Sequence, residues 1–526
     1  MSLDGTMQGW IEKETATATF GTMKSQTAEA RKSKPRESKP RKSKARNERL
    51  RRRFQMVLDA MSQKPSLKFP AACRGRAEVE ASYRFVHNEH VTFHSILAPH
   101  RDATIERIRE QPVVLIPQDT TELDVTRPHE VMVDSGPLNE SSRVGFHDHV
   151  NMAMTPEHLV LGVVKAKIWA RDPVEFEKDA DQKRAERRAK AIEDKESIRW
   201  MEGYRAVCEV AQAVPGTQIV SLADSEADIY ELISAGQAVE AGRKASFIIR
   251  ACQNRALAPT DETSSASQKH LREQVASTPV LAQRTIDIRG RDPKSKDDRK
   301  RKQPREARTA NVTVQAARVK LRGPYRPGGK LADVEVNAVL VSELNPPPGV
   351  EPIEWLLLTD LPIDLKDDAL RVIDYYACRW HIEIYYRILK SGCKVEESQL
   401  ERAERFEPYV ALCMIVAWRV MYVMMLGREC PDLPCDVAFE DDEWQAVYAT
   451  VKKEPPPSQA PSMKTMIGLV ASLGGWLGRK CDGEPGPKAT WVGMQRMTDL
   501  ALGWRARIEQ SAPAAEKDPG SKRRRE

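Results

Sequence analysis

The alternation of apolar and polar residues divides the chain into helical ends and a strand-rich middle. From Asn47, apolar residues recur at helical spacing until Pro65 ends the pattern. Residues 113–116 form a run of apolar, mostly β-branched residues, which is typical of a buried central strand. Beyond about residue 405 the pattern is helical again, and its most apolar window spans 16 residues and contains Arg419. That window is short and charged for a membrane span, so it predicts a buried helix and no membrane association.

Further runs complete the expected organisation, which is an α/β fold. Strands are predicted at residues 149–155, 158–170 and 217–223, and a helix at residues 367–390. Alternation with Pro and Gly punctuation favours a β-rich insertion with hairpins at residues 251–365. The expected parts are a disordered basic tail (1–46), a helical domain (47–104), the first part of an α/β core (105–250), the insertion (251–365), the last core helix (366–405), a helical C-terminal domain (406–510) and a disordered basic tail (511–526).

Basic residues are concentrated in a few segments, although the net charge is only +7. Residues 31–53 contain 13 Lys and Arg, residues 291–308 form a second basic run, and the chain ends in "SKRRRE". Such segments suit an acidic polymer such as DNA, while each one taken alone also fits a solvated linker. The nine cysteines have neither disulfide nor zinc spacing, and no secretory signal is visible. We therefore expect reduced thiols and a cytoplasmic protein.

Three carboxylates occupy positions that suit a shared site. Asp119 and Asp224 each close an apolar strand, where α/β folds often bind ligands, although aspartate is also an ordinary turn residue. Glu383 lies on the predicted helix, and at roughly 100° per residue it shares a stripe about 80° wide with four other polar residues. Those four are Tyr376, Arg379, Arg387 and Lys390. A solvated face with i,i+4 ion pairs is the alternative interpretation.

The apolar residues of the same helix centre on a different edge, roughly 100° from the polar stripe. They are Ile373, Ala377, Trp380, Ile384 and Ile388. We expect this edge, with Trp380 and Ile384, to anchor the helix to the core.

Converging carboxylates repel one another unless cations intervene. Oxygen ligands select Mg²⁺ or Mn²⁺ rather than zinc. Two such ions about 4 Å apart can activate an attacking oxygen and stabilise the leaving oxygen of a phosphodiester. We therefore expect two Mg²⁺ or Mn²⁺ ions per active site.

Three sequence blocks resemble the DDE transposases of the Tn5 kind, within the IS4 family. They are "DTT" from Asp119, "DSEADIYEL" from Asp224, and the signature that joins Tyr376, Arg379, Glu383 and Lys390 with its spacing intact. The resemblance implies an RNase H-like mixed-sheet core in which Asp119, Asp224 and Glu383 bind the metals. It also implies cut-and-paste transposition: nicking at the element's end, a hairpin intermediate, and joining to target DNA.

Other residues take roles from the resemblance one at a time. Trp355 would stack on a base flipped out during hairpin formation, and the alternative is a tryptophan that only packs in the core. Arg250 would contact the end DNA near that base, and the alternative is an ordinary surface arginine. Tyr376, Arg379 and Lys390 would bind phosphates, and Arg387 replaces a lysine. Arg49, Arg53 and Arg84 would contact DNA in an end-recognition domain, although Asn47 stands where the family usually has Asp. Residues 406–510 would form a dimerisation domain.

The leading hypothesis is an active transposase that binds double-stranded DNA, both transposon ends and target, and forms a homodimer on paired ends. The resemblance implies a bacterial, nucleoid-associated protein. A catalytically silent DNA-binding relative or an inhibitor of transposition is the alternative. A metal-dependent nuclease without strand transfer is a third, against which Trp355 and the dimerisation-like C-terminus argue.

Overall fold

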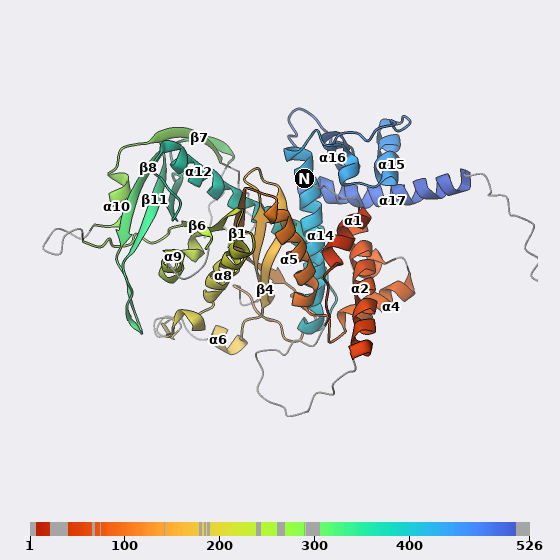
Figure 1. The fold of residues 1–526 in the computed structure, drawn as a ribbon, viewed down its shortest axis with the longest axis horizontal. Coiled ribbons are helices and arrows are strands. Elements are labelled where there is room, and N and C mark those ends of the chain that lie inside the picture. The colour runs from red at the N-terminus through yellow and green to blue at the C-terminus, as the bar shows by residue number, and fades with distance from the viewer. Residues whose placement is uncertain are drawn as a thin grey trace, which may run out of the picture. The chain divides into compact units, whose positions relative to one another are not determined.

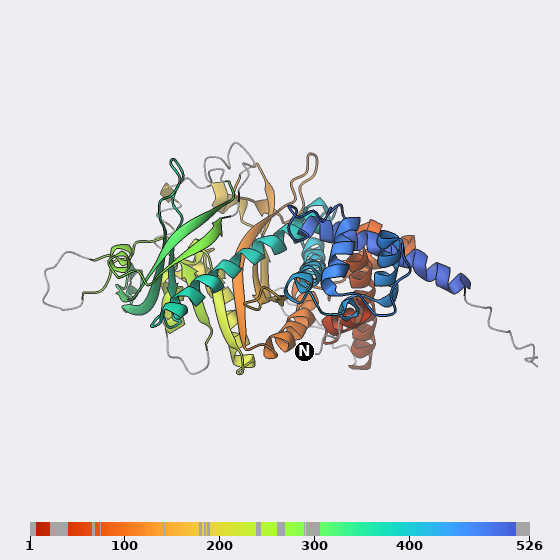
Figure 2. The ribbon, with the colours of Figure 1, turned by 90° about the horizontal axis from the view of Figure 1, so that it is seen from above.

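The computed structural model describes residues 7–20, 40–65, 69–73, 75–140, 142–177, 181–182, 186, 190–237, 244–259, 269–288, 290 and 306–511. The chain folds into two compact units (Figures 1 and 2). Unit 1 combines Met1–His100 with Tyr385–Glu526, and unit 2 is Arg101–Ile384. The N-terminal and C-terminal helical segments, which we expected to be separate domains, therefore share one unit.

Unit 2 is built on one ten-stranded mixed sheet. Nine of its strands follow one another across the sheet in the order β2 (Gly136–Pro137), β3 (Val144–Met154), β1 (Val113–Asp124), β5 (Gln218–Ala223), β6 (Ser246–Arg250), β12 (Glu354–Thr359), β11 (Val334–Glu343), β8 (Arg308–Leu321) and β7 (Ala282–Ile288). The tenth strand, β4 (Val160–Trp169), also pairs with β3. Strands β1, β5 and β6 are mutually parallel, and every other pairing in this sheet is antiparallel. The fold is α/β with a mixed sheet, as the sequence predicted.

The β-rich segment is not a separate domain. Its strand β12 pairs with β6 through Leu357 opposite Arg250, and β11, β8 and β7 then extend the same sheet. The expected insertion at residues 251–365 is thus an extension of the core sheet. A separate two-stranded hairpin, β9 (Tyr325–Arg326) with β10 (Gly329–Lys330), follows β8.

Helices pack on this sheet because their apolar faces match its buried strands. Helix α8 (Ile198–Ala213) packs on β3, β4 and β5, and Trp200 and Val207 on it are fully buried. Helix α9 (Tyr230–Gln237) contacts α8 and β11, and α10 (Leu271–Ala276) contacts β8 and β11. Among the described residues, the remaining α-helices that begin in this unit are α6 (Pro173–Glu177), α12 (Lys366–Ala377) and α13 (His381–Arg387).

Unit 1 is helical and is centred on α14 (Ala403–Glu429), which contacts α2, α4, α16 and α17. Its helices are α1 (Met7–Thr15), α2 (Pro40–Gln63), α3 (Phe69–Ala72), α4 (Arg76–Val86), α14, α15 (Asp441–Lys452), α16 (Met463–Leu473) and α17 (Pro487–Ser511), while α5 (Phe93–Arg109) begins in it. Among the described residues α14 is the one helix long and apolar enough to cross a membrane, and 94% of its most apolar window is buried inside the protein. It is a buried helix, as the sequence predicted.

The prediction of a disordered tail at residues 1–46 is wrong for part of this segment, because residues 7–15 form helix α1. Trp10 and Ile11 on this helix are buried, and the backbone N–H of Phe20 donates to Asn47 Oδ1 at 2.7 Å. Glu14 and His100 form a fully buried hydrogen-bonded pair. These contacts supply the burial that orders the segment, while residues 1–6, 21–39 and the expected C-terminal tail from residue 512 lie outside the described residues.

Candidate active site

The sheet register brings Asp119 and Asp224 to the same level. Strands β1 and β5 run parallel, and their last registered pair is Pro117 with Leu222. Asp119 and Asp224 each lie two residues beyond that pair, so both lie just past the carboxyl end of the parallel pairing between β1 and β5. Ligands bind at this end of the strands in many α/β sheets.

The two aspartates differ in backbone setting, and this corrects one expectation. Asp224 directly follows β5 and caps a 3₁₀ turn, Ser225–Ala227, where its Oδ1 accepts a hydrogen bond from Glu226 N at 2.8 Å. Asp119 does not close its strand, because β1 continues to Asp124 by pairing with β3, with Asp119 opposite Val150. Its Oδ1 accepts from Thr120 N at 2.7 Å.

The segment that carries Glu383 is helical but changes type several times. Helix α12 ends at Ala377, a 3₁₀ turn covers Cys378–Trp380, α13 follows, and a π-helical turn covers Ile388–Gly392. A constant 100° per residue therefore does not apply from Tyr376 to Lys390. Mid-helix 3₁₀ and π turns are common at functional sites.

This change of helix type corrects part of the expected apolar anchor. Trp380 is 41% exposed, Ala377 is exposed and Ile384 is half-buried. Ile373 and Ile388 are buried, as expected, and Ile382, which was not among the expected anchors, is buried as well. The 3₁₀ turn rotates Trp380 out of the core, so that an aromatic ring lies at the surface beside Arg379.

Arg379 joins two of the three carboxylates. Its Nη1 donates to Asp119 Oδ2 at 2.8 Å and its Nη2 donates to Glu383 Oε1 at 2.9 Å. The Asp119 and Arg379 side chains are 17% and 13% exposed, against 38% for Glu383. The guanidinium thus supplies positive charge between carboxylates that would otherwise repel each other.

The pKa of Asp119 is raised from 3.8 to about 7. Burial is the largest cause, and the charges of Asp224 and Glu383 also raise this pKa, while Arg379 and the hydrogen bond from Thr120 N lower it. Burial alone would lower the pKa of Arg379, but Asp119, Tyr376 and Glu383 raise it above its ordinary value. Asp119 thus lies within electrostatic reach of both other carboxylates, and a carboxylate in this position favours a nearby cation.

These three residues fit a hard divalent cation by their chemistry, because all donors are carboxylate oxygens. In the part of the chain that the structure describes, no three His, Cys, Asp or Glu side chains lie close enough together to hold a metal ion. The guanidinium of Arg379 fills the position between Asp119 and Glu383. Cation binding by the triad therefore requires Arg379 to leave at least one of these carboxylates.

Aromatic and basic side chains surround the carboxylates in unit 2. Tyr376 is buried, burial raises the pKa of its hydroxyl, and its ring meets the half-buried Trp355 edge-to-face with centroids 5.7 Å apart. Arg250 is half-buried at the end of β6, and its Nη2 donates to Glu354 O at 3.3 Å. The structure thus brings Trp355 and Tyr376 together next to the Arg379 turn.

The other expected DNA-binding residues lie in unit 1. Arg387 is exposed at the end of α13, and Lys390 lies in the π-helical turn with its Nζ 3.4 Å from Glu396 Oε1. In the N-terminal helices Arg49 and Arg84 are exposed and Arg53 is half-buried. Their contacts to DNA stay predictions.

A polar network next to Asp119 was not predicted from the sequence. It joins Arg199, Thr120, His149 and Gln118. Arg199 Nε donates to Thr120 Oγ1 at 2.9 Å, and this hydroxyl also lies 2.8 Å from His149 Nδ1. His149 Nε2 lies 3.1 Å from Gln118 Oε1, and burial holds the pKa of His149 well below its ordinary value. These residues come from α8, β1 and β3, so only the fold brings them together.

Asp228, the last acid of the "DSEAD" block, has a structural role. It accepts hydrogen bonds from the backbone N–H groups of Cys252 and Gln253, each at 2.9 Å, and it pairs with Arg255. It thereby fixes the chain that leaves β6 just after Arg250. Glu226 is largely exposed and pairs with Arg199 at 2.7 Å.

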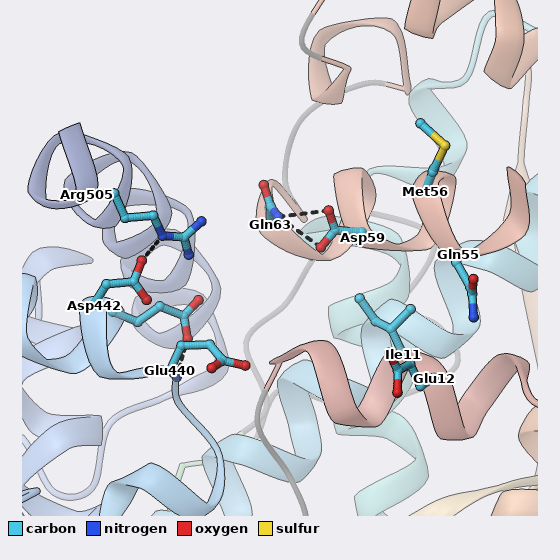
Figure 3. A pocket seen from close by; sticks show the side chains of 10 residues that line it. Ile11, Glu12, Gln55, Met56, Asp59, Gln63, Glu440, Asp442 and Arg505 are labelled. Atoms are coloured by element: carbon cyan, nitrogen blue, oxygen red, sulfur yellow. Dashed lines mark hydrogen bonds and ion pairs between the residues drawn. The ribbon is translucent and has the colours of Figure 1, made fainter. Parts of the chain in front are cut away.

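Unit 1 contains a pocket of about 500 Å³ (Figure 3). Its lining is Ile11, Glu12, Gln55, Met56, Asp59, Gln63, Glu440, Asp442, Glu443 and Arg505. Burial, with the charges of Glu440 and Asp59, raises the pKa of Glu443 to about 7, and Arg505 pairs with Asp442. Such an acidic lining repels phosphate, so this pocket is no candidate for binding DNA.

Two family models match the chain. One is described as transposase DNA-binding and matches residues 44–91, which include Arg49, Arg53 and Arg84. The other, the transposase Tn5 dimerisation domain, matches residues 415–512, from within α14 through α17.

Among solved structures, a cryo-EM structure of a piggyBac transposase synaptic complex with hairpin DNA aligns with 96% of this chain and 79% of its own, at 10% identity and a TM-score of 0.30. That likeness is too weak to bear on the fold or the function. The chain is therefore similar to transposase DNA-binding domains over residues 44–91 and to the Tn5 transposase dimerisation domain over residues 415–512, as its sequence motifs predicted.

Proposed function

We propose that this chain is a DDE transposase that cuts and joins DNA by metal-dependent phosphodiester chemistry. The matched domains support a DNA transposase that dimerises. The observation that carries the catalytic part is that Arg379 binds both Asp119 and Glu383, while Asp224 lies close enough for its charge to act on Asp119. In this proposal, strands β4, β3, β1, β5 and β6 form the RNase H-like core that bears both aspartates.

Each residue of the site has a proposed role. Asp119, Asp224 and Glu383 hold two Mg²⁺ or Mn²⁺ ions. When bound, these ions supply charge stabilisation and activation of an attacking oxygen at the scissile phosphate. Arg379 turns from the carboxylates toward a DNA phosphate, for which its planar fork is suited.

The surrounding residues bind DNA in this proposal. Tyr376, Arg387 and Lys390 bind backbone phosphates of the transposon end, and Arg250 binds next to them. Arg49, Arg53 and Arg84 recognise the end sequence. Homodimerisation on paired ends then brings two sites to the same target DNA.

The test is a cleavage assay on the DNA that flanks this gene. If paired terminal inverted repeats are present, purified protein with Mg²⁺ is expected to nick their ends, form hairpins and join the ends to target plasmid. EDTA should stop all three steps. Binding without nicking would support the catalytically silent relative, and nicking without joining of precut ends would support a nuclease.

Trp355 is expected to act in the hairpin step. An aromatic face replaces the stacking that a flipped base loses, worth about 1–3 kcal/mol per base. Trp355→Ala is therefore expected to lower hairpin formation about 10- to 100-fold while leaving the first nick, and Trp355→Phe should restore most of it. Denaturing gels separate the two products. Equal loss of nick and hairpin would show that Trp355 supports the fold instead.

A further inference from the structure

Arg199, the second residue of α8, reaches both aspartate-bearing segments. Its Nε donates to Thr120 Oγ1 at 2.9 Å, and its Nη2 donates to Glu226 Oε2 at 2.7 Å. Thr120 directly follows Asp119 on β1, and Glu226 lies two residues beyond Asp224. One guanidinium therefore bridges the ends of two neighbouring strands.

The two residues that Arg199 binds also donate backbone hydrogen bonds to the carboxylates of the two aspartates. Thr120 N donates to Asp119 Oδ1 at 2.7 Å, and Glu226 N donates to Asp224 Oδ1 at 2.8 Å. A shift of either segment would therefore change the direction of its carboxylate. Because both segments share one partner, Arg199 fixes the spacing between the carboxylates as well as each orientation.

Arg199 is itself held in place. Its side chain is 13% exposed, and its guanidinium carbon lies 5.8 Å from the Trp169 ring centroid and 5.7 Å from that of Trp200. Its Nη1 also donates to Glu196 O at 3.1 Å. Cation–π contacts and a planar fork of donors leave it little rotational freedom.

We propose that Arg199 is a positioning residue that sets the orientation and spacing of Asp119 and Asp224 for cation binding. This role rests on the proposed function, because it concerns the same carboxylates. Arg199 does not touch the reacting atoms; it acts through Thr120 and Glu226. Partners that orient metal ligands in this way typically contribute 10- to 100-fold to metal affinity.

The experiment measures Mn²⁺ binding by electron paramagnetic resonance on the full-length protein bound to its end DNA. Arg199→Gln is expected to weaken Mn²⁺ binding about 10- to 100-fold. Arg199→Lys should restore it in part, because an ammonium retains the charge without the fork. The matched control is Arg326→Gln, which removes another arginine–carboxylate pair of unit 2, with Glu231, and should leave Mn²⁺ affinity unchanged.

The two arms of the bridge can be tested separately. Thr120→Val and Glu226→Gln are each expected to weaken Mn²⁺ binding, and each effect should shrink when added to Arg199→Gln, because the residues act through one guanidinium. If Arg199→Gln unfolds the protein, as shown by its melting temperature, these two variants alone decide the question.

The outcomes separate this role from the proposed function. Wild-type protein that binds no Mn²⁺, or binds it unchanged after Glu383→Ala, contradicts the proposed metal site itself. Wild-type binding that is lost in Glu383→Ala but unchanged in Arg199→Gln, Thr120→Val and Glu226→Gln contradicts only the role of Arg199.

Discussion

Glu383→Ala is expected to lower the rate of end cleavage by about 1,000-fold or more, while DNA binding remains close to wild type. In the proposed site Glu383 holds a metal ion, so its loss removes transition-state stabilisation of several kcal/mol, and each 1.4 kcal/mol corresponds to about tenfold in rate. Stability should change little, because the ion pair of Glu383 with Arg379 is partly exposed and such pairs contribute about 0–1 kcal/mol. Cleavage is measured on labelled end DNA, and binding by gel shift.

Asp374→Ala is the matched control for this prediction. Asp374 lies on α12, in the same helical segment, and its carboxylate pairs with Arg284 at 2.6 Å. Its loss should leave cleavage within about twofold of wild type. Cleavage that survives Glu383→Ala would exclude Glu383 from the catalytic residues, and loss of DNA binding would show that its role is to support the DNA surface.

The arrangement of Arg379 explains how two of the proposed metal ligands, Asp119 and Glu383, can lie near each other without a metal ion. A buried carboxylate without a cation is unfavourable, and Arg379 satisfies Asp119 and Glu383 at once. The same side chain is suited to DNA phosphate. A phosphate that draws Arg379 away would leave the two carboxylates for metal ions, so DNA binding and metal binding would be coupled through one residue.

The sequence predicted these carboxylates because their signals are local. Asp224 follows an apolar run directly, and the spacing of Tyr376, Arg379 and Glu383 is contained in one helical segment. In the structure Arg379 binds both Asp119 and Glu383, and the roles of these residues in catalysis stay proposals. Arg199 had no such signal: it lies 79 residues from Thr120, and only the packing of α8 on the sheet reveals it.

Errors in the sequence analysis arose where tertiary contacts override local pattern. Strand β1 runs past Asp119 because β3 supplies an antiparallel partner. Trp380 leaves the core because a 3₁₀ turn interrupts the helix, which periodicity at 3.6 residues per turn cannot anticipate. Helix α1 is ordered because Trp10 and Glu14 are buried in unit 1, although charge composition indicated a disordered tail.

Asp119→Asn is expected to stabilise the protein at pH 8 while abolishing cleavage. The folded-state pKa of Asp119, about 7, lies above its ordinary value of 3.8, so between these values the folded protein holds a proton that the unfolded chain has released. The contribution of Asp119 to stability therefore falls as the pH rises from about 4 to 7, and the full penalty remains above pH 7. A shift of this size corresponds to at most about 4 kcal/mol.

Asparagine removes this penalty because it carries no charge. Like the protonated carboxyl group, it keeps one carbonyl oxygen that accepts a hydrogen bond from Thr120 N or from Arg379. In EDTA the variant should melt several degrees above wild type at pH 8 and at nearly the same temperature at pH 4, by differential scanning fluorimetry. Asp374→Asn, at an exposed ion pair, should show no such dependence. If the melting temperatures of Asp119→Asn and wild type differ by the same amount at pH 4 and pH 8, the buried charge of Asp119 is not the cause of the difference. Mg²⁺ should reduce the difference in melting temperature between the variant and the wild type at pH 8, because it binds only the wild-type carboxylates and stabilises that protein. That result would make one buried aspartate the source of both the instability and the chemistry of the site.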